Sequence, residues 1–201
     1  MGLRVDQNLE RMRDVVLSGN PALADAAIAA DDEIDAMNVS LTERCYDLLI
    51  RENPMASDLR LVVSVVRITG EFERIGDLAL RVAKIAPDQA LLASSERSYD
   101  ILLVMVDEAV ERYRTALRVW GDLDLAAATD LANGSRAMDL CNEQITETLL
   151  GLQGPDAVAV ALRTMTVSRA LDRIADHTAI LGSRMRYLIT GDPGDLAAEV
   201  R

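Results

Sequence analysis

The stretches RITGEFERIGDLALRVAK (Arg67–Lys84) and TVSRALDRIADHTAILGS (Thr166–Ser183) decide how this chain is built. When the two are aligned, three positions carry the same residue type: Arg74/Arg173, Ile75/Ile174 and Asp77/Asp176. Near matches such as Glu73/Asp172 surround them. A segment that recurs within one chain indicates a duplicated structural unit. We therefore expect two copies of one unit.

Glycine and proline mark where helices end, and the 201 residues contain only 11 glycines and 5 prolines. Between these breaks apolar residues recur at helical spacing, and aromatic residues make up only 3% of the chain, which favours helices packed on helices. We expect six helices, at about residues 3–18, 21–51, 54–87, 95–120, 123–152 and 155–190. The predicted fold class is all-α, with two tandem three-helix bundles over residues 1–88 and 94–192 and a tail over 193–201.

The formal net charge of −12 argues against a nucleic-acid partner, because phosphate backbones are bound by lysine and arginine. Cys45 and Cys141 are too few for a disulfide framework and lack metal-ligand spacing, which indicates a reducing compartment. We find neither a signal peptide nor an apolar run long enough to span a membrane. The expected location is therefore the cytoplasm, without direct membrane insertion.

Eleven pairs of acidic residues are spaced four apart, which places the two members of a pair on one side of a helix, and four of these pairs are candidate ligands. They are Asp31/Asp35, Glu73/Asp77, Asp139/Glu143 and Asp172/Asp176. Carboxylates that converge from neighbouring helices are oxygen ligands for Mg, Mn, Fe or Zn. The alternative interpretation is a solvated acidic surface in which arginines pair locally.

Helical spacing also places Leu59, Val62, Val66 and Gly70 on one apolar line, with Glu73 and Asp77 at its edge. A second series, Arg60, Arg67, Arg74 and Arg81, recurs every seven residues and either docks an acidic partner or pairs with acids of its own bundle. The single histidine, His177, has no nucleophile near it in sequence and is expected to be a spectator beside Asp176 or a peripheral ligand. Phosphate-loop, dinucleotide and nucleophile-elbow motifs are absent, so we expect no catalytic residue, no bound organic cofactor and no enzymatic activity.

Two longer segments carry a family resemblance: RENPMASDLRLVVSVVRITGEFERIGDLA (Arg51–Ala79) and ALDRIADHTAILGSRMRYLITGD (Ala170–Asp192). They resemble the two signatures of the PhoU family of bacterial phosphate-transport regulators. The resemblance implies a negative regulator of the phosphate-starvation response, which couples the ATPase of a phosphate transporter to a sensor histidine kinase and restrains phosphate uptake. It also implies a homodimer.

The resemblance further implies metal binding through acidic motifs, which Asp31/Asp35, Glu73/Asp77 and Asp172/Asp176 match, with Fe, Zn, Mg, Mn or Ni as candidate metals. The second-helix motif of the second repeat departs from the pattern, because Ser135 stands where an acid belongs, although Asp139 is kept and Glu143 lies one turn further on. Two alternative functions stay open: a metal-storage or metal-sensing bundle, and a metal-dependent hydrolase.

Overall fold

The computed structural model describes residues 1–200, with side chains described up to Leu196. Within this part of the chain the protein is entirely helical, which confirms the predicted fold class. The helices are α1 (Gly2–Ser18), α2 (Pro21–Arg51), α3 (Ser57–Ala83), α4 (Gln89–Ala93), α5 (Glu96–Asp122), α6 (Leu125–Ala132), α7 (Arg136–Leu150) and α8 (Ala157–Thr190). Two 3-10 helices, η1 (Ala86–Asp88) and η2 (Pro193–Val200), complete the described elements. Arg201, the last residue of the expected tail, lies outside them.

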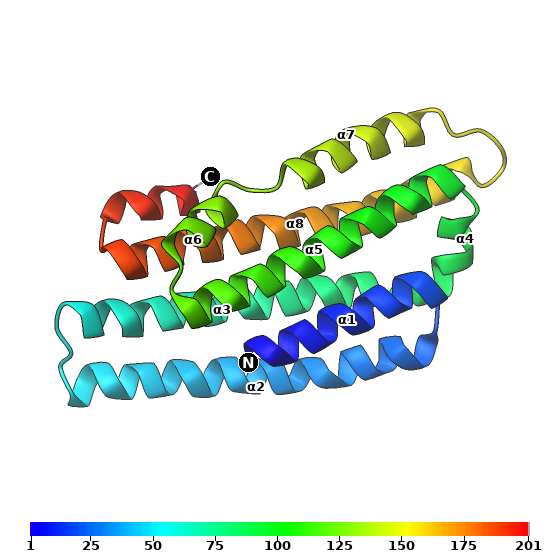
Figure 1. Cartoon of the computed structure of the whole chain (residues 1–201). Coiled ribbons are helices and arrows are strands. Elements are labelled where there is room, and N and C mark those ends of the chain that lie inside the picture. Colours follow the sequence, from blue (N-terminus) through cyan, green and yellow to red (C-terminus); the bar gives the residue numbers. More distant parts are fainter. Residues whose placement is uncertain (201) are drawn as a thin grey trace.

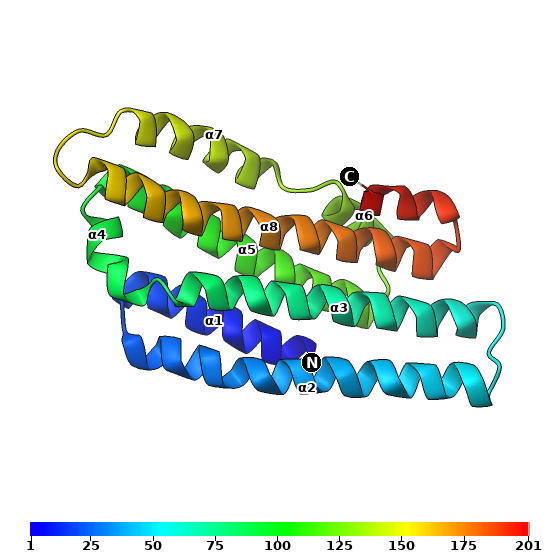
Figure 2. The same ribbon diagram turned by 180° about the vertical axis from the view of Figure 1, so that it is seen from behind.

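The long helices lie roughly along one direction, with α1, α2 and α3 on one side and α5, α7 and α8 on the other (Figure 1). α3 and α8 are the helices that join these two groups, and they run antiparallel, side by side (Figure 2). The hairpin of α2 and α3 extends well beyond the start of α1 (Figure 1). α1 is attached to α5 by Arg114, whose Nε donates to Oδ1 of Asp6 at 2.9 Å.

One continuous hydrophobic core connects the helices of both groups. It includes Met12 of α1, Ile75 of α3, Tyr113 of α5 and Ile174 of α8, all nearly inaccessible to solvent. The Tyr113 ring packs edge-on against Phe72 of α3 with ring centroids 5.7 Å apart, and its hydroxyl donates to the carbonyl of Gly2 at 2.9 Å. The groups therefore stabilise one another, and the boundaries predicted at residues 88 and 94 stay a prediction.

The structure differs from the expected six helices at two places. The helix expected over residues 123–152 is interrupted after Ala132, because Gly134 adopts a φ of 82° and Ser135 then caps α7 by accepting from the amide of Met138 at 3.1 Å. The short α4 lies in the connection that was expected to be a plain link. Both differences are local and leave the all-helical class unchanged.

α6 packs unusually closely on α8 at Gly182. A Cβ atom at this position would lie 2.6 Å from the amide nitrogen of Ala132 and 2.8 Å from the carbonyl oxygen of Ala128. Only glycine leaves room for the backbone of α6 at this distance. The contact places the turn between α6 and α7 beside the C-terminal third of α8. Of the helices that the structure describes, none is long and apolar enough to cross a lipid bilayer.

Candidate functional site

The first acidic cluster lies between α2 and α3, where the structure brings Asp31, Asp35, Glu73 and Asp77 together. Burial raises the pKa of the Asp31 carboxyl, and the nearby charges of Asp77 and Asp35 raise it further. The pKa of Glu73 is also raised, by burial first and then by Asp77 and Asp35. These shifts show that the two predicted pairs from different helices form one electrostatically coupled group. A Cβ at Gly76 of α3 would lie 3.7 Å from Oδ1 of Asp31, an ordinary van der Waals contact that shows how closely Asp31 approaches α3.

The second cluster lies between α7 and α8 and contains Asp139, Asp172 and Asp176. Burial raises the pKa of Asp176, followed by the charge of Asp172, with a smaller contribution from Asp139. Glu143 is not among the groups that shift this pKa. The residue before it, Asn142, instead donates from Nδ2 to Oδ1 of Asp172 at 2.7 Å. Sequence reasoning missed Asn142, since no spacing rule identifies an amide as the partner of an acid 30 residues away.

The donor chemistry of both clusters suits a hard cation, because all of their donors are carboxyl or amide oxygens. A bound cation would also relieve the mutual repulsion that raises the pKa values of Asp31 and Glu73. Within the described chain, however, no three His, Cys, Asp or Glu side chains are gathered closely enough to form a ready coordination site. The ligand chemistry therefore fits a cation, whereas a closed coordination shell is not preformed.

His177 connects the two groups of helices. Its Nδ1 donates to Oε2 of Glu71 on α3 at 2.6 Å, and the two side chains are only 8% and 15% exposed. Such a hydrogen bond between poorly solvated groups fixes the position of α8 on α3. His177 is thus a structural link between helices, and Glu71, more than a hundred positions away, gave no signal in the sequence.

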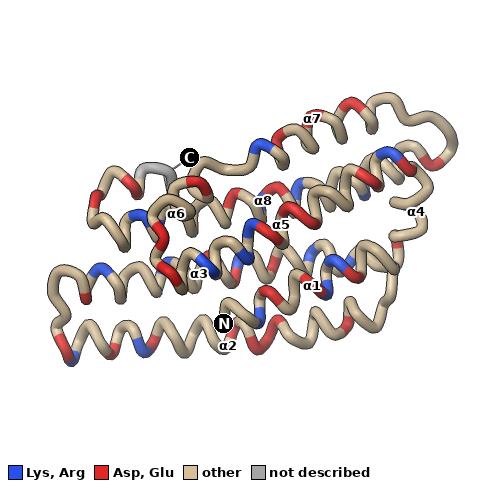
Figure 3. Tube along the Cα trace, in the orientation of Figure 1, with Lys and Arg blue, Asp and Glu red and all other residues tan. Residues whose placement is uncertain are grey.

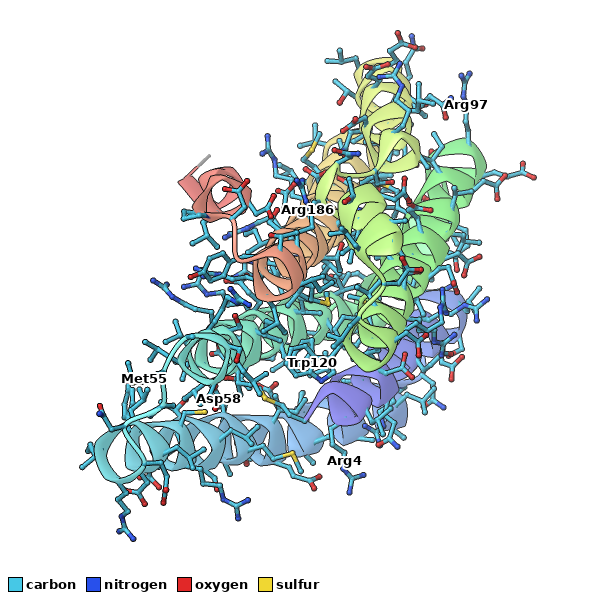
Figure 4. All side chains as sticks on the ribbon, turned by 60° about the vertical axis from the view of Figure 1, so that its left-hand side comes forward. Arg4, Met55, Asp58, Arg97, Trp120 and Arg186 are labelled. Atoms are coloured by element: carbon cyan, nitrogen blue, oxygen red, sulfur yellow. The ribbon has the colours of Figure 1, made fainter. Side chains whose placement is uncertain are left out.

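An open cavity of about 710 Å³ lies on α8 next to the second cluster. Arg173, Asp176 and His177 line one side, and the α6–α7 turn at Gly134 lines another. Arg186 closes the far end through an ion pair of 2.5 Å with Asp195 (Figure 4). The one hydroxyl on α8 in this lining, that of Ser183, donates to the carbonyl of Ala179, so the cavity lacks a paired nucleophile and base among its described residues.

The remaining charged and apolar patterns lie on the outside of α3. Arg67, Arg74 and Arg81 are exposed and have no ion-pair partner among the described residues. Leu59 is exposed and Val66 is half-buried, so the predicted apolar line is an outer surface. The core side of α3 is instead formed by a different set: Ile68, Phe72, Ile75, Ala79 and Val82. Acidic positions occur on each of the long helices, so these arginines lie in an acidic environment (Figure 3).

Comparison with known proteins gives the same family as the signatures. The family model described as "PhoU domain" matches residues 1–86. A crystal structure of PhoU from Pseudomonas aeruginosa superposes with a TM-score of 0.89 and 27% sequence identity, covering 96% of this chain and 93% of that one. In sequence and in fold, the chain is similar to the PhoU family.

The similarity to PhoU proteins extends over nearly the whole chain. The phosphate-specific transport system accessory protein PhoU homolog of Deinococcus radiodurans is 28% identical over 191 residues, which are 93% of this chain and 88% of that protein. Its counterpart from Pseudomonas aeruginosa is 27% identical over 193 residues, which are 95% of this chain and 80% of that protein. PhoU from Streptococcus pneumoniae, at 21% identity and a TM-score of 0.74, shares the fold.

Proposed function

We propose that this chain is a cytoplasmic negative regulator of the phosphate-starvation response. In this proposal it couples the ATPase of a phosphate transporter to a sensor histidine kinase and restrains phosphate uptake when phosphate is plentiful. The observation that carries the proposal is the match to a PhoU structure over 96% of the chain, together with relatives named as accessory proteins of phosphate-specific transport.

A regulator of this kind acts by binding one state of its partner more tightly than another. To shift a partner from about 1% to about 99% in the inhibited state, the two affinities must differ by about 10⁴-fold. Charged and apolar surfaces that this chain leaves uncovered supply such differential contacts.

The homodimer implied by the family resemblance stays a prediction, which light scattering of the purified chain tests.

We also propose that the two acidic clusters bind divalent or iron-type cations, with Fe, Zn, Mg, Mn and Ni as the candidates. Asp31, Asp35, Glu73 and Asp77 would hold one cation. The second group, Asp139, Asp172 and Asp176, would hold another, with Glu143 further away. A bound cation supplies positive charge between helices that otherwise repel through their carboxylates.

The test of the regulatory role is deletion of the gene followed by measurement of phosphate-responsive transcription and of phosphate uptake in phosphate-rich medium. We expect both to rise, and a plasmid copy of the gene to restore them. Unchanged transcription and uptake, combined with altered metal content of the cells, would favour the alternative function in metal storage or sensing. Hydrolysis of a phosphoester by the purified, metal-loaded protein would favour the metal-dependent hydrolase.

Metal binding is tested by elemental analysis of protein purified without chelators or a metal-affinity tag. The variant carries Glu73→Gln, Asp77→Asn, Asp172→Asn and Asp176→Asn, and circular dichroism checks that it remains helical. Stoichiometric metal in the unsubstituted protein alone would support the proposed ligands. Metal in neither protein would leave the clusters as solvated acidic surfaces.

A further inference from the structure

The solvent-facing sides of α3 and α8 form one continuous surface. Figure 2 shows these helices side by side in front of α1 and α5. We call this surface the outer face and define it by its exposed residues: Leu59, Val63, Arg67, Arg74 and Arg81 on α3, and Val158, Leu162, Thr166 and Arg173 on α8. It lies opposite the core sides of the same helices, and none of the functions derived above explains its pattern.

Positive charge occupies the middle of the outer face. Arg67, Arg74 and Arg81 are seven residues apart, so they lie on nearly the same side of α3 and span about 21 Å along it. Arg173 of α8 corresponds to Arg74 in the sequence repeat. None of the four arginines forms an ion pair among the described side chains, although Arg74 lowers the pKa of Glu73 and Arg173 lowers that of Asp176. Other arginines of this acidic chain do form ion pairs, as Arg114 does with Asp6.

Exposed apolar side chains occupy the two ends of the outer face. Leu59 and Val63 at the start of α3 are 42% and 39% exposed, and Val158 and Leu162 at the start of α8 are 72% and 65% exposed. Because the two helices run antiparallel, these apolar pairs lie at opposite ends (Figure 2). Clustered exposed apolar side chains rimmed by charged ones are typical of protein-binding surfaces.

We propose that the outer face binds an amphipathic helix of a partner protein that carries acidic side chains in its middle and apolar side chains towards both ends. The acidic residues of that helix pair with the exposed arginines, and its apolar residues cover the two exposed apolar pairs. A helix is the fitting shape because the arginines follow a straight heptad line, which a second helix lying alongside can match. The inference deepens the proposed function and rests on it only in requiring that the chain act through a partner protein.

Two other occupants fit the observations less well. A second copy of the chain would bring its own arginines against Arg67, Arg74 and Arg81, and opposed like charges disfavour such a contact. An anionic membrane would meet the arginines but would also face Asp77 and Asp176, which are exposed close to the same surface, and the net charge of −12 would oppose its approach. A narrow acidic helix contacts the arginine line without covering these carboxylates.

The test uses a synthetic helical peptide as the probe, with three glutamates seven residues apart and leucines towards both ends. Fluorescence anisotropy measures its affinity for the full chain, for a variant with Arg67→Gln, Arg74→Gln and Arg81→Gln, and for a charge-matched control. The control carries Arg44→Gln, Arg97→Gln and Arg136→Gln, three exposed arginines that also lack ion pairs but are scattered over α2, α5 and α7. Of these, Arg97 projects into solvent at the start of α5 (Figure 4).

We expect the outer-face variant to bind the peptide about 10-fold more weakly or worse, and the control to remain within about two-fold of the unsubstituted chain. Added salt should weaken binding to the unsubstituted chain until it approaches that of the outer-face variant. A peptide of the same composition in scrambled order should bind the unsubstituted chain no more tightly than the designed peptide binds the outer-face variant. Circular dichroism confirms that both triple variants are folded, which is expected because every substituted side chain is exposed.

Several outcomes would overturn the inference. The first is that the peptide does not bind, and the second is that both triple variants bind it equally more weakly than the unsubstituted chain. The third is self-association of the chain that only the outer-face variant loses. The fourth is binding to phosphatidylglycerol vesicles that depends on these arginines, without binding of the peptide. The regulatory role fails separately, if deletion of the gene leaves phosphate-responsive transcription unchanged. Peptide binding that depends on the outer face would then still stand as a property of the chain.

Discussion

Replacement of Gly182 by alanine should destabilise the protein, although alanine is the better helix former. The added Cβ would lie 2.6 Å from the nitrogen of Ala132, 2.8 Å from the oxygen of Ala128 and 3.0 Å from the carbonyl carbon of Leu131. These are backbone atoms of α6 and its end, which cannot rotate away, so α6 has to withdraw by about 1 Å to restore normal contact. Forcing a methyl group into such a contact costs about 1–3 kcal/mol, and the better helix propensity offsets up to about 1 kcal/mol.

We therefore expect the free energy of unfolding to fall by about 1–2 kcal/mol, which lowers the melting temperature of a chain of this size by about 2–8 °C. Gly70→Ala is the matched control, because Gly70 also lies inside a long helix but a Cβ there meets nothing within 4 Å. That substitution should raise the stability by about 0.5–1 kcal/mol. Urea unfolding of both variants measures the difference, and a gain of stability in Gly182→Ala would refute the close contact of α6 with α8.

Three further changes should alter the stability in defined directions. Asp31→Asn should stabilise the metal-free protein by a few tenths of a kcal/mol at pH 7 but not below about pH 4. The reason is that the pKa of Asp31 is raised in the folded state, so the folded state loses stability as pH rises through that pKa. Urea unfolding at both pH values measures the difference. His177→Leu should cost about 1–3 kcal/mol, since it leaves Glu71 poorly solvated without its donor, and adding Glu71→Leu should recover part of the loss in a double-mutant cycle. Asp124→Ala should lower the thermal stability by about 1 kcal/mol, because Asp124 accepts from the amides of Ala126 and Ala127 at the start of α6; calorimetry measures it.

Local patterns were enough to predict most of the long helices and the spacing of the acidic pairs in the first cluster. Asp31/Asp35 and Glu73/Asp77 each lie four apart on adjacent antiparallel helices, so two correct local predictions also bring the pairs together. The break between α6 and α7 had a local signal in Asn133-Gly134, a dipeptide typical of turns. The prediction of one continuous helix passed over it because apolar spacing continues on both sides.

Contacts between distant segments could not be predicted in the same way. The bond between His177 and Glu71 depends on the register of α8 against α3, and no spacing within either helix specifies that register. The burial of the apolar line of α3 could not be predicted for a different reason. Leu59, Val62 and Val66 fit helical spacing as well as the core residues do, so periodicity alone could not tell the buried side from the outer side.

α3 carries acidic and basic side chains that form no ion pairs with one another among the described residues. Glu73 and Asp77 lie towards α2, where their charges repel that of Asp31. Arg67, Arg74 and Arg81 lie on the outer face without an ion pair among the described residues, although Arg74 lowers the pKa of Glu73. Mutual neutralisation between these groups would add only about 0.3–0.5 kcal/mol per helical pair. If the carboxylates bind a cation and the arginines bind an acidic helix, as proposed, each binding event gains electrostatic energy that folding leaves unused. Because the repeat places Asp172, Asp176 and Arg173 on α8 in the same positions, the separation of charge belongs to the duplicated unit itself.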